Sequence, residues 1–248
     1  MALANILKIF CEEPYAGNLH VRFCEGQADK PLTIINKYNK VRRESSLVYS
    51  TDIMKVILAS SNNGKIKEFK EILARFNIEV LSLKDINFTQ EIIEDGNSFY
   101  ENALIKAKTI YDLYHIPVIA DDSGLCVDYL NGEPGIYSAR YGGFSDEADR
   151  IKLILKKMEG VVEREAHFHC SIVFYISSNL YKHFAGEVYG TLDYTEKGGN
   201  GFGYDVIFIP NGYNETFGEL SSSIKNDISH RALAIKSFIK YLEDDFSN

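Results

Sequence analysis

The sequence predicts an α/β protein, because short apolar runs typical of strands alternate with segments of helical periodicity. The run Lys55–Ala59 is rich in β-branched residues, and a helix pattern follows it, with apolar side chains on one face at spacings of three and four: Ile66, Phe69, Leu73 and Phe76. A second apolar run, Ile116–Ala120, comes after another segment with helical spacing. The 248 residues suffice for one sizeable core, or for one domain with an appendage.

The composition excludes several classes of protein. Apolar residues make up 45% and charged residues 25%, which is ordinary for a soluble globular chain. A net charge of −8 argues against binding of a nucleic-acid backbone. No apolar run approaches the length of a membrane span, and the N-terminus has no signal-peptide pattern, so we expect no membrane partner and a cytoplasmic location. The cysteines lack metal-ligand spacing and are expected to be plain reduced thiols: Cys11, Cys24, Cys126 and Cys170.

Residues 1–53 differ from the rest of the chain and carry no motif with a mechanism. They contain one candidate strand, Leu19–Phe23, and a basic cluster at Lys40, Arg42 and Arg43. The cluster is either a partner-binding patch or a solvated linker, and the linker is the simpler interpretation. A typical domain start begins at Met54. We therefore predict an N-terminal extension without an assigned role over 1–53 and the main domain over 54–248.

The first candidate binding element is the polar stretch 60–65 between the strand at 55–59 and the next helix. A helix that begins after such a loop directs free backbone N–H groups toward an anion. Lys65 also places a positive charge in the first helical turn, where the helix dipole disfavours a cation. A bound anion would remove that conflict. The alternative is that Asn, Gly and Lys only form the turn between strand and helix, as they do in many such loops.

A second candidate is Glu94, in a loop before a predicted helix. Ser98 and Glu101 form a capping box, so the helix starts at about residue 99. Glu94 is then either a metal-binding carboxylate or a surface acid that complements the helix dipole. Asn102 and Lys106 share one helix face, and Lys106 is able to point toward the same loop. The predicted buried face consists of Phe99, Ala103, Ala107, Ile110 and Leu113.

The apolar run 116–120 ends in Asp121-Asp122-Ser123-Gly124. A strand that ends there places two carboxylates and a hydroxyl at a sheet edge, where open α/β sheets bind ligands. Adjacent carboxylates repel each other, so the pair implies a cation, a shared proton or solvent exposure. The alternative is a simple strand-to-turn junction.

The C-terminal half is predicted to contain a helix over 145–158 and a hairpin of strands that turns at Ser178-Asn179. His167 and His169 lie two apart on one strand face, which would allow a two-His metal set. Without a third ligand nearby, satisfied sheet histidines are the preferred interpretation.

Two further segments suit a flat, anionic ligand. The loop 198–205 is dense in glycine and carries Phe202 and Tyr204, which either stack on a ring or belong to the core, and it leads into a predicted strand over 206–210. Three side chains able to carry positive charge gather at the start of the last helix, for which Ser229 is the predicted N-cap: Lys225, His230 and Arg231. Because helix starts favour acids, this cluster also points to a bound anion. The combined inventory fits a nucleoside triphosphate with a hard cation such as Mg²⁺.

At this point the chain resembles a known family, the inosine triphosphatase or Ham1 family of XTP/dITP diphosphatases. Six blocks carry the resemblance in order: ASSNNGK (59–65), EDGNSFYENALIKA (94–107), ADDSGLCVDYLNGEPGIYSARY (120–141), FHC (168–170), GFGYDVIF (201–208) and KNDISHRALA (225–234). The resemblance implies an elongated mixed β-sheet with flanking helices in two lobes around a cleft, usually in a homodimer. It does not cover residues 1–53.

The resemblance also implies hydrolysis of ITP, dITP or XTP to the monophosphate and pyrophosphate. Glu94 and Asp122 would bind Mg²⁺, and Asp122 would accept the proton of the attacking water. Substrate would be held by Ser60, Ser61, Asn62, Asn63, Gly64, Lys65, Ser123, Phe202, Gly203, Tyr204, Asp205, Lys225, His230 and Arg231.

Some positions depart from the family pattern, which often has Thr for Ser60, Glu-Thr-Gly for Glu94-Asp95-Gly96, and Pro for Val206. Ser60 keeps a hydroxyl, and Asp95 adds a carboxylate beside the expected metal. Two alternatives are a Maf-like enzyme for modified pyrimidine nucleotides, which the FGYD and SHR blocks disfavour, and a non-catalytic nucleotide-binding module. The retained acids argue against the second alternative.

Overall fold

The computed structural model describes residues 20–21, 32–33, 54–76 and 78–245. Two short strands, β1 (His20–Val21) and β2 (Leu32–Thr33), pair antiparallel. Of the strand predicted at Leu19–Phe23, His20 and Val21 are described and are extended, and the other residues lie outside the described ranges. The basic cluster near residue 42, Cys11 and Cys24 lie outside the described residues.

The main part of the structure is a six-stranded mixed sheet with the strand order β4-β3-β5-β6-β7-β8. The three strands β4, β3 and β5 are parallel, and every later pairing is antiparallel. The mixed α/β sheet predicted from the sequence is thus confirmed. Its strands are β3 (Met54–Leu58), β4 (Ile78–Ser82), β5 (Val118–Val127), β6 (Glu165–Ser177), β7 (Leu180–Leu192) and β8 (Phe208–Pro210).

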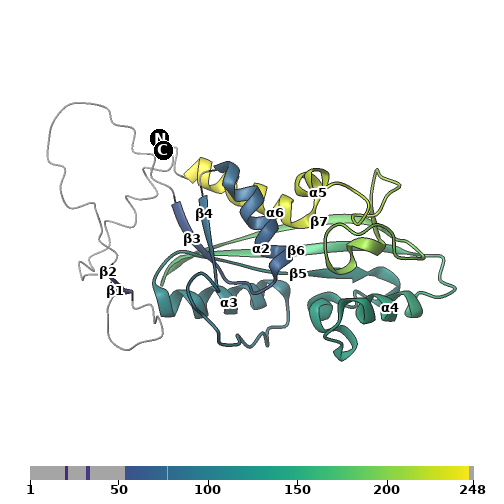
Figure 1. Cartoon of the computed structure of the whole chain (residues 1–248), viewed down its shortest axis with the longest axis horizontal. Coiled ribbons are helices and arrows are strands. Elements are labelled where there is room, and N and C mark those ends of the chain that lie inside the picture. Colours follow the sequence, from purple (N-terminus) through teal and green to yellow (C-terminus); the bar gives the residue numbers. More distant parts are fainter. Residues whose placement is uncertain (1–19, 22–31, 34–53, 77, 246–248) are drawn as a thin grey trace.

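Helices cover both faces of this elongated sheet (Figure 1). One face carries α2 (Asn63–Leu73), α5 (Ser222–Ile228) and α6 (His230–Asp245), and the other carries α3 (Phe99–Tyr114) and α4 (Glu147–Lys157). Short 3-10 helices complete the connections: η1 (Ala74–Phe76), η2 (Asp128–Leu130), η3 (Gly135–Gly143) and η4 (Gly203–Ile207). Within the described ranges, no helix has the length and apolar character needed to cross a membrane.

The core divides into three apolar clusters along the sheet. One lies between the sheet and helices α2 and α6, and a second lies under α3. The third fills the far end, where α4, η4 and β8 pack against the ends of β5 and β6. The long strands β5 and β6 contribute side chains to all three clusters, and β7 contributes to two of them.

The central strand is longer than the sequence pattern predicted. β5 does not end at Asp121 but continues through the polar residues to Val127, because β6 pairs with it over its whole length. Asp121 and Asp122 therefore lie within a strand and not in a turn. They come after the last residue pair between β3 and β5, Leu58 with Ile119, so at this point β5 pairs with β6 on one side only. Their side chains point to opposite faces, as successive residues of a strand do.

Three smaller predictions were also wrong. Leu113 was assigned to the buried face of its helix, yet 57% of it is exposed, whereas the nearby Tyr111 and Tyr114 pack against the cluster under α3. Phe76 was assigned to the apolar face of the helix before it, yet it lies in η1 and 37% of it is exposed. Val206 and Ile207 were assigned to a strand, but they belong to η4, and β8 begins at Phe208. The N-caps at Ser98 and Ser229 are confirmed by hydrogen bonds from Glu101 N and Ala232 N.

Replacing Phe238 by alanine tests the cluster under α6. Its ring is fully buried and makes edge contacts with Phe174 and Phe184, with centroids 5.0 and 5.6 Å away. We expect Phe238→Ala to lower the free energy of unfolding by about 3–5 kcal/mol, measured by urea denaturation. Leu113→Ala is the exposed control and should change it by less than about 0.5 kcal/mol. Equal effects of the two variants would contradict this description of the core.

Candidate active site

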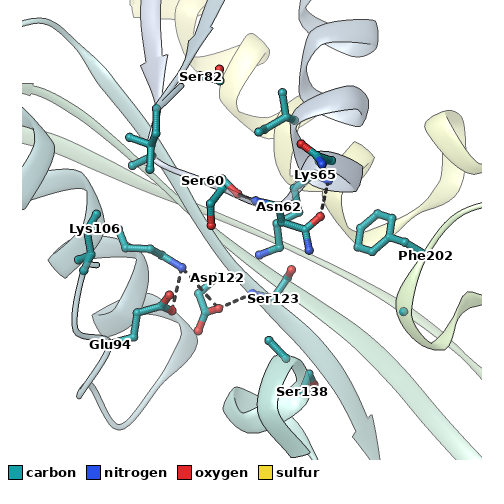
Figure 2. A pocket seen from close by; sticks show the side chains of 18 of the residues that line it. Ser60, Asn62, Lys65, Ser82, Glu94, Lys106, Asp122, Ser123, Ser138 and Phe202 are labelled. Carbon is teal, nitrogen blue, oxygen red and sulfur yellow. Dashed lines mark hydrogen bonds and ion pairs between the residues drawn. The ribbon is translucent and has the colours of Figure 1, made fainter. Parts of the chain in front are cut away.

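A pocket of about 1150 Å³ lies where the start of α2, the loop before α3 and the η4 loop meet over β5. Figure 2 shows Asn62 and Lys65 on one side, Glu94 and Lys106 on another, and Phe202 beside the start of α2. The pocket brings together almost all of the predicted site residues. Those that line it are Ser60, Ser61, Asn62, Asn63, Lys65, Glu94, Asp122, Ser123, Phe202, Gly203, Tyr204, Asp205, Lys225, His230 and Arg231.

The loop at the start of α2 is held in a fixed shape. Asn62 is the N-cap, and its side chain accepts a hydrogen bond from Lys65 N at 3.1 Å. Ser60 Oγ accepts from Asn62 N at 3.2 Å. Gly64, the one predicted site residue outside the pocket lining, lies against the Phe202 ring: a Cβ there would be 2.4 Å from Phe202 Cδ1. Glycine is therefore required for the ring to close on the helix start.

At the pocket wall, charged side chains of alternating sign link five elements. Asp121 Oδ2 lies 3.0 Å from Lys65 Nζ and 3.2 Å from Arg231 Nη2. Arg231 also pairs with Glu68, whose other oxygen is 2.7 Å from Lys225 Nζ. Lys225 pairs in turn with Asp205. The chain of contacts thus joins β5, α2, α5, α6 and η4.

These contacts decide the charge of Asp121. Burial by itself raises the pKa of this carboxyl, but Lys65 and then Arg231 outweigh it, so the pKa of Asp121 is well below its ordinary value. The pKa of Glu68 is likewise lowered, because Arg231 and Lys225 outweigh the effect of its burial. Both acids remain ionised, and they hold three cations at the edge of the pocket: Lys65, Lys225 and Arg231.

Asp122 lies on the opposite face of β5, in a different environment. Lys106 Nζ is 3.7 Å from Asp122 Oδ1 and 2.9 Å from Glu94 Oε2. Asn102 Nδ2 donates to Asp122 Oδ2 at 3.1 Å. Burial raises the pKa of Asp122, Glu94 adds to the increase, and Lys106 and Lys65 only partly offset it. A carboxylate with a raised pKa is better suited to accept a proton near neutral pH.

The two carboxylates Glu94 and Asp122 fit a substrate-borne hard cation. Among the described residues, no group of three or more His, Cys, Asp or Glu side chains is placed to hold a metal ion. Magnesium in nucleotide sites is usually bound by one or two carboxylates, with phosphate oxygens and water completing the shell. A pair of acids at the wall of a pocket with an anion-binding loop meets that requirement.

The opposite end of the pocket presents an aromatic ring and neutral or paired polar groups. Phe202 lies 4.7 Å from Lys225 Nζ and 5.7 Å from the Arg231 guanidinium, measured to its ring centroid. His230 stacks on Phe168 with centroids 4.8 Å apart, and burial together with Arg231 lowers its pKa, so the ring is neutral. His230 Nδ1 is buried without a hydrogen-bond partner in the protein. A flat polar ligand would suit this end.

The sequence reasoning did not identify every group at the site. Glu68 was missed, although an acid on the apolar face of α2, next to Phe69, is a detectable signal. Asn102 and Lys106 were noted but given no role. Lys84 and Arg140 also line the pocket, and both come from connections whose position depends on the sheet.

The two sheet histidines have separate partners. His169 Nδ1 is 2.9 Å from Glu187 Oε1, whereas His167 Nδ1 is 3.9 Å from Asp128 Oδ1. His169 Nε2 also contacts Ser171 Oγ at 3.0 Å. His169 is therefore a satisfied sheet residue, as expected, whereas His167 lies near Asp128 at a distance too long for a hydrogen bond.

Fold and pocket together define a nucleotide-binding type of α/β protein, with an anion loop, a carboxylate pair and an aromatic wall. The particular family follows from comparison with known proteins. Residues 56–241 match the sequence model of the Ham1 family, and the chain belongs to that family.

The chain is also similar to relatives that carry curated names. The chain is 47% identical over 193 residues to the dITP/XTP pyrophosphatase of Listeria innocua, covering 77% of this chain and 95% of the relative. It is 45% identical over 195 residues to the dITP/XTP pyrophosphatase of Bacillus subtilis, covering 77% and 98%. Among solved structures, the Staphylococcus aureus Ham1 protein matches with a TM-score of 0.69 and 38% identity, covering 77% of this chain and 99% of that one. A HAM1 protein from Coxiella burnetii gives 0.70 and 35%, with coverage of 77% and 99%.

Replacing Asp121 by asparagine tests the buried ion pairs. At pH 7 we expect Asp121→Asn to lower the free energy of unfolding by about 3–5 kcal/mol, since Lys65 and Arg231 lose a buried counter-charge. The depressed pKa of Asp121 stabilises the fold above the pKa of the unfolded chain, about 3.9, and that contribution is lost as pH falls toward the folded pKa. The difference between wild type and variant should therefore shrink from pH 5 to pH 3.

Urea denaturation at each pH measures this difference. Asp112→Asn, which removes an exposed carboxylate paired with Lys108, controls for the loss of one negative charge. A wild-type advantage over Asp121→Asn that stays constant or grows on acidification would show that Asp121 is not stabilised as an anion.

Proposed function

We propose that this chain hydrolyses the non-standard purine nucleoside triphosphates ITP, dITP and XTP to the monophosphate and pyrophosphate. The observation that carries the proposal is the meeting of Asp122 and Glu94 with the anion loop at the start of α2 in one pocket. The names of the family relatives support the same activity. Residues 54–248 would form the catalytic domain, with residues 1–53 as an extension.

The start of α2 would hold the phosphates. Backbone N–H groups at this helix end and the hydroxyls of Ser60 and Ser61 can donate to phosphate oxygens. Lys65 Nζ uses one direction for Asp121 and retains further N–H donors for the ligand. Its pairing with Asp121 keeps the ammonium at the pocket wall, so little rearrangement is needed on binding.

Asp122 would act as the general base. Its carboxylate would take a proton from water as the water oxygen bonds to the α-phosphorus. The anhydride bond between the α- and β-phosphates would then break, so that pyrophosphate leaves and the nucleoside monophosphate remains. Magnesium, held by Glu94, Asp122 and the phosphates, would neutralise charge on the polyphosphate and make the attacking water more acidic. Lys106 fixes both acids, and it stays protonated because Asp122 and Glu94, opposed by burial, raise its pKa.

Selection for a 6-keto purine would come from the η4 and α6 end of the pocket. Phe202 would stack on the base, while Lys225 and Arg231 would present donors toward O6. In this structure both cations are buried and paired with acids, which fixes their direction. An amino group at position 6 would leave those donors unpaired, which costs more than an apolar misfit. Ser123, Gly203, Tyr204, Asp205 and His230 would complete the contacts to base and ribose.

The homodimer and the choice of Mg²⁺ are further parts of this proposal that rest on the family resemblance. The cytoplasmic location and the expected lack of nucleic-acid and membrane partners rest on the net charge and the hydropathy of the sequence. The main alternative is a non-catalytic nucleotide-binding module, and a single assay separates the two.

Pyrophosphate release from ITP, XTP, dITP, ATP and GTP tests the proposal. We expect rapid release from the first three with Mg²⁺ present, loss of release after chelation, and recovery when Mg²⁺ is returned. Asp122→Asn should lower kcat by about 10²- to 10⁴-fold, since a neutral amide cannot accept the proton. Asp128→Asn, just beyond the end of the same strand and outside the pocket, is the matched control and should retain activity.

Two results would change the conclusion. If ITP binds but no substrate yields pyrophosphate, the chain is a binding module. If Asp122→Asn keeps wild-type kcat, another group is the base.

Replacing Phe202 by alanine tests the stacking role. Base–aromatic stacking contributes about 1–3 kcal/mol, so Phe202→Ala should raise KM for ITP roughly 5- to 150-fold. Phe202→Tyr keeps the ring and should restore KM. Tyr129→Ala, which removes an exposed ring on η2, is the control. An unchanged KM in Phe202→Ala would place the base elsewhere.

A further inference from the structure

Asn102 is fully buried in α3 and has polar contacts in two directions. Its Nδ2 donates to Asp122 Oδ2 at 3.1 Å, and its Oδ1 accepts from Gly96 N at 2.9 Å. The first contact reaches the strand that carries the general base of the proposed function. The second reaches the loop that carries Glu94. One amide therefore contacts Asp122 directly and, through Gly96 N, the loop that carries Glu94.

The orientation of this amide follows from its partners. The Gly96 N–H can only donate, so it must face the carbonyl oxygen of Asn102. The NH₂ group then has to face Asp122, which supplies that carboxylate with a hydrogen-bond donor. The NH₂ group of Asn102 therefore points at Asp122 only because Gly96 N holds the carbonyl oxygen of the same amide on the other side.

The loop is packed closely against the helix start at this point. A Cβ at Gly96 would lie 2.8 Å from Asn102 Oδ1 and 2.7 Å from Glu101 Cβ. Glu101 Oε2 also accepts from Asn97 N at 2.6 Å. Glu94 is two residues before Gly96, so the position of its carboxylate depends on the same docking.

We propose that Asn102 is a positioning residue that couples docking of the Glu94 loop to the orientation of Asp122. The proposal deepens the proposed function and rests on it. When the loop lies on α3, the amide is fixed and Asp122 has its donor. When the loop leaves, Asn102 Oδ1 loses its partner, and the amide is free to turn its oxygen toward the carboxylate, which repels it. Docking of the loop thus positions Glu94 and orients Asp122 at the same time, and these are the two acids that would share a metal ion.

Three variants separate coupling from simple support of the fold. Asn102→Leu keeps the approximate volume and removes both hydrogen bonds. Gly96→Ala displaces the loop without changing the Asn102 side chain. The double variant combines them. Thr109→Val is the matched control, because it removes one side-chain hydrogen bond on the same helix, from Thr109 Oγ1 to Ile105 O at 2.8 Å, away from loop and strand.

We expect Asn102→Leu and Gly96→Ala each to lower kcat for ITP by about 10- to 100-fold, the range found when groups that orient a site are removed. KM should change less, because the loop at the start of α2 and the Phe202 wall are untouched. In the double variant kcat should be no lower than in Asn102→Leu alone, since the effect of the loop passes through Asn102. Thr109→Val should keep wild-type kcat.

Hydrogen exchange of the Gly96 amide gives a readout without substrate or metal. Asn102→Leu should accelerate this exchange at least about 10-fold, whereas Thr109→Val should not. If Asn102→Leu does not fold, Asn102→Ser replaces it, because a serine hydroxyl is too short to reach both partners and should give the same loss.

Three outcomes would overturn the proposal: kcat losses that multiply in the double variant, wild-type kcat in a folded Asn102 variant, or unchanged exchange at Gly96. Failure of the proposed function is a separate result, namely no pyrophosphate release by the wild-type protein. The exchange measurement remains interpretable in that case.

Discussion

The structure depends on keeping the charge of Asp121 inside a central strand. A carboxylate without solvent needs counter-charges in good geometry, and the chain supplies Lys65 from α2 and Arg231 from α6. Arg231 is itself buried and has Glu68 as a second counter-charge. Glu68 also pairs with Lys225, which in turn pairs with Asp205, so both belong to the same network. Elements far apart in the sequence are thereby held in one arrangement around the pocket.

The strand period separates two neighbouring acids into two roles. Asp121 faces α2 and α6 and is stabilised as an anion, whereas Asp122 faces α3 and has a raised pKa. A helix or a turn would not divide adjacent side chains so completely, because only a strand sends them to opposite faces. Neighbouring β5 residues thus supply a structural charge on one face and, on the other, the carboxylate proposed to accept a proton.

Elements on both faces of β5 line the pocket, so its parts are held in place by different elements. The end proposed to hold phosphates is a helix start fixed by Asn62, and the end proposed to hold the base is a glycine-rich loop closed onto Gly64 by Phe202. The carboxylate pair depends on α3, through Lys106 and Asn102. In the proposed function, substrate binding and proton transfer would therefore be carried by separate elements.

The sequence by itself determined the α/β class, the helix starts at Ser98 and Ser229, and most residues of the pocket, because capping, periodicity and family blocks are local signals. It did not determine that β5 runs on to Val127, since that depends on pairing with β6. Nor did it show that Lys65 and Arg231 bind Asp121, that Glu68 joins Arg231 to Lys225, or that Asn102 faces both Gly96 and Asp122. Arg231 and Asp121 are 110 residues apart in the chain, so their contact exists only once sheet register and helix packing bring them together.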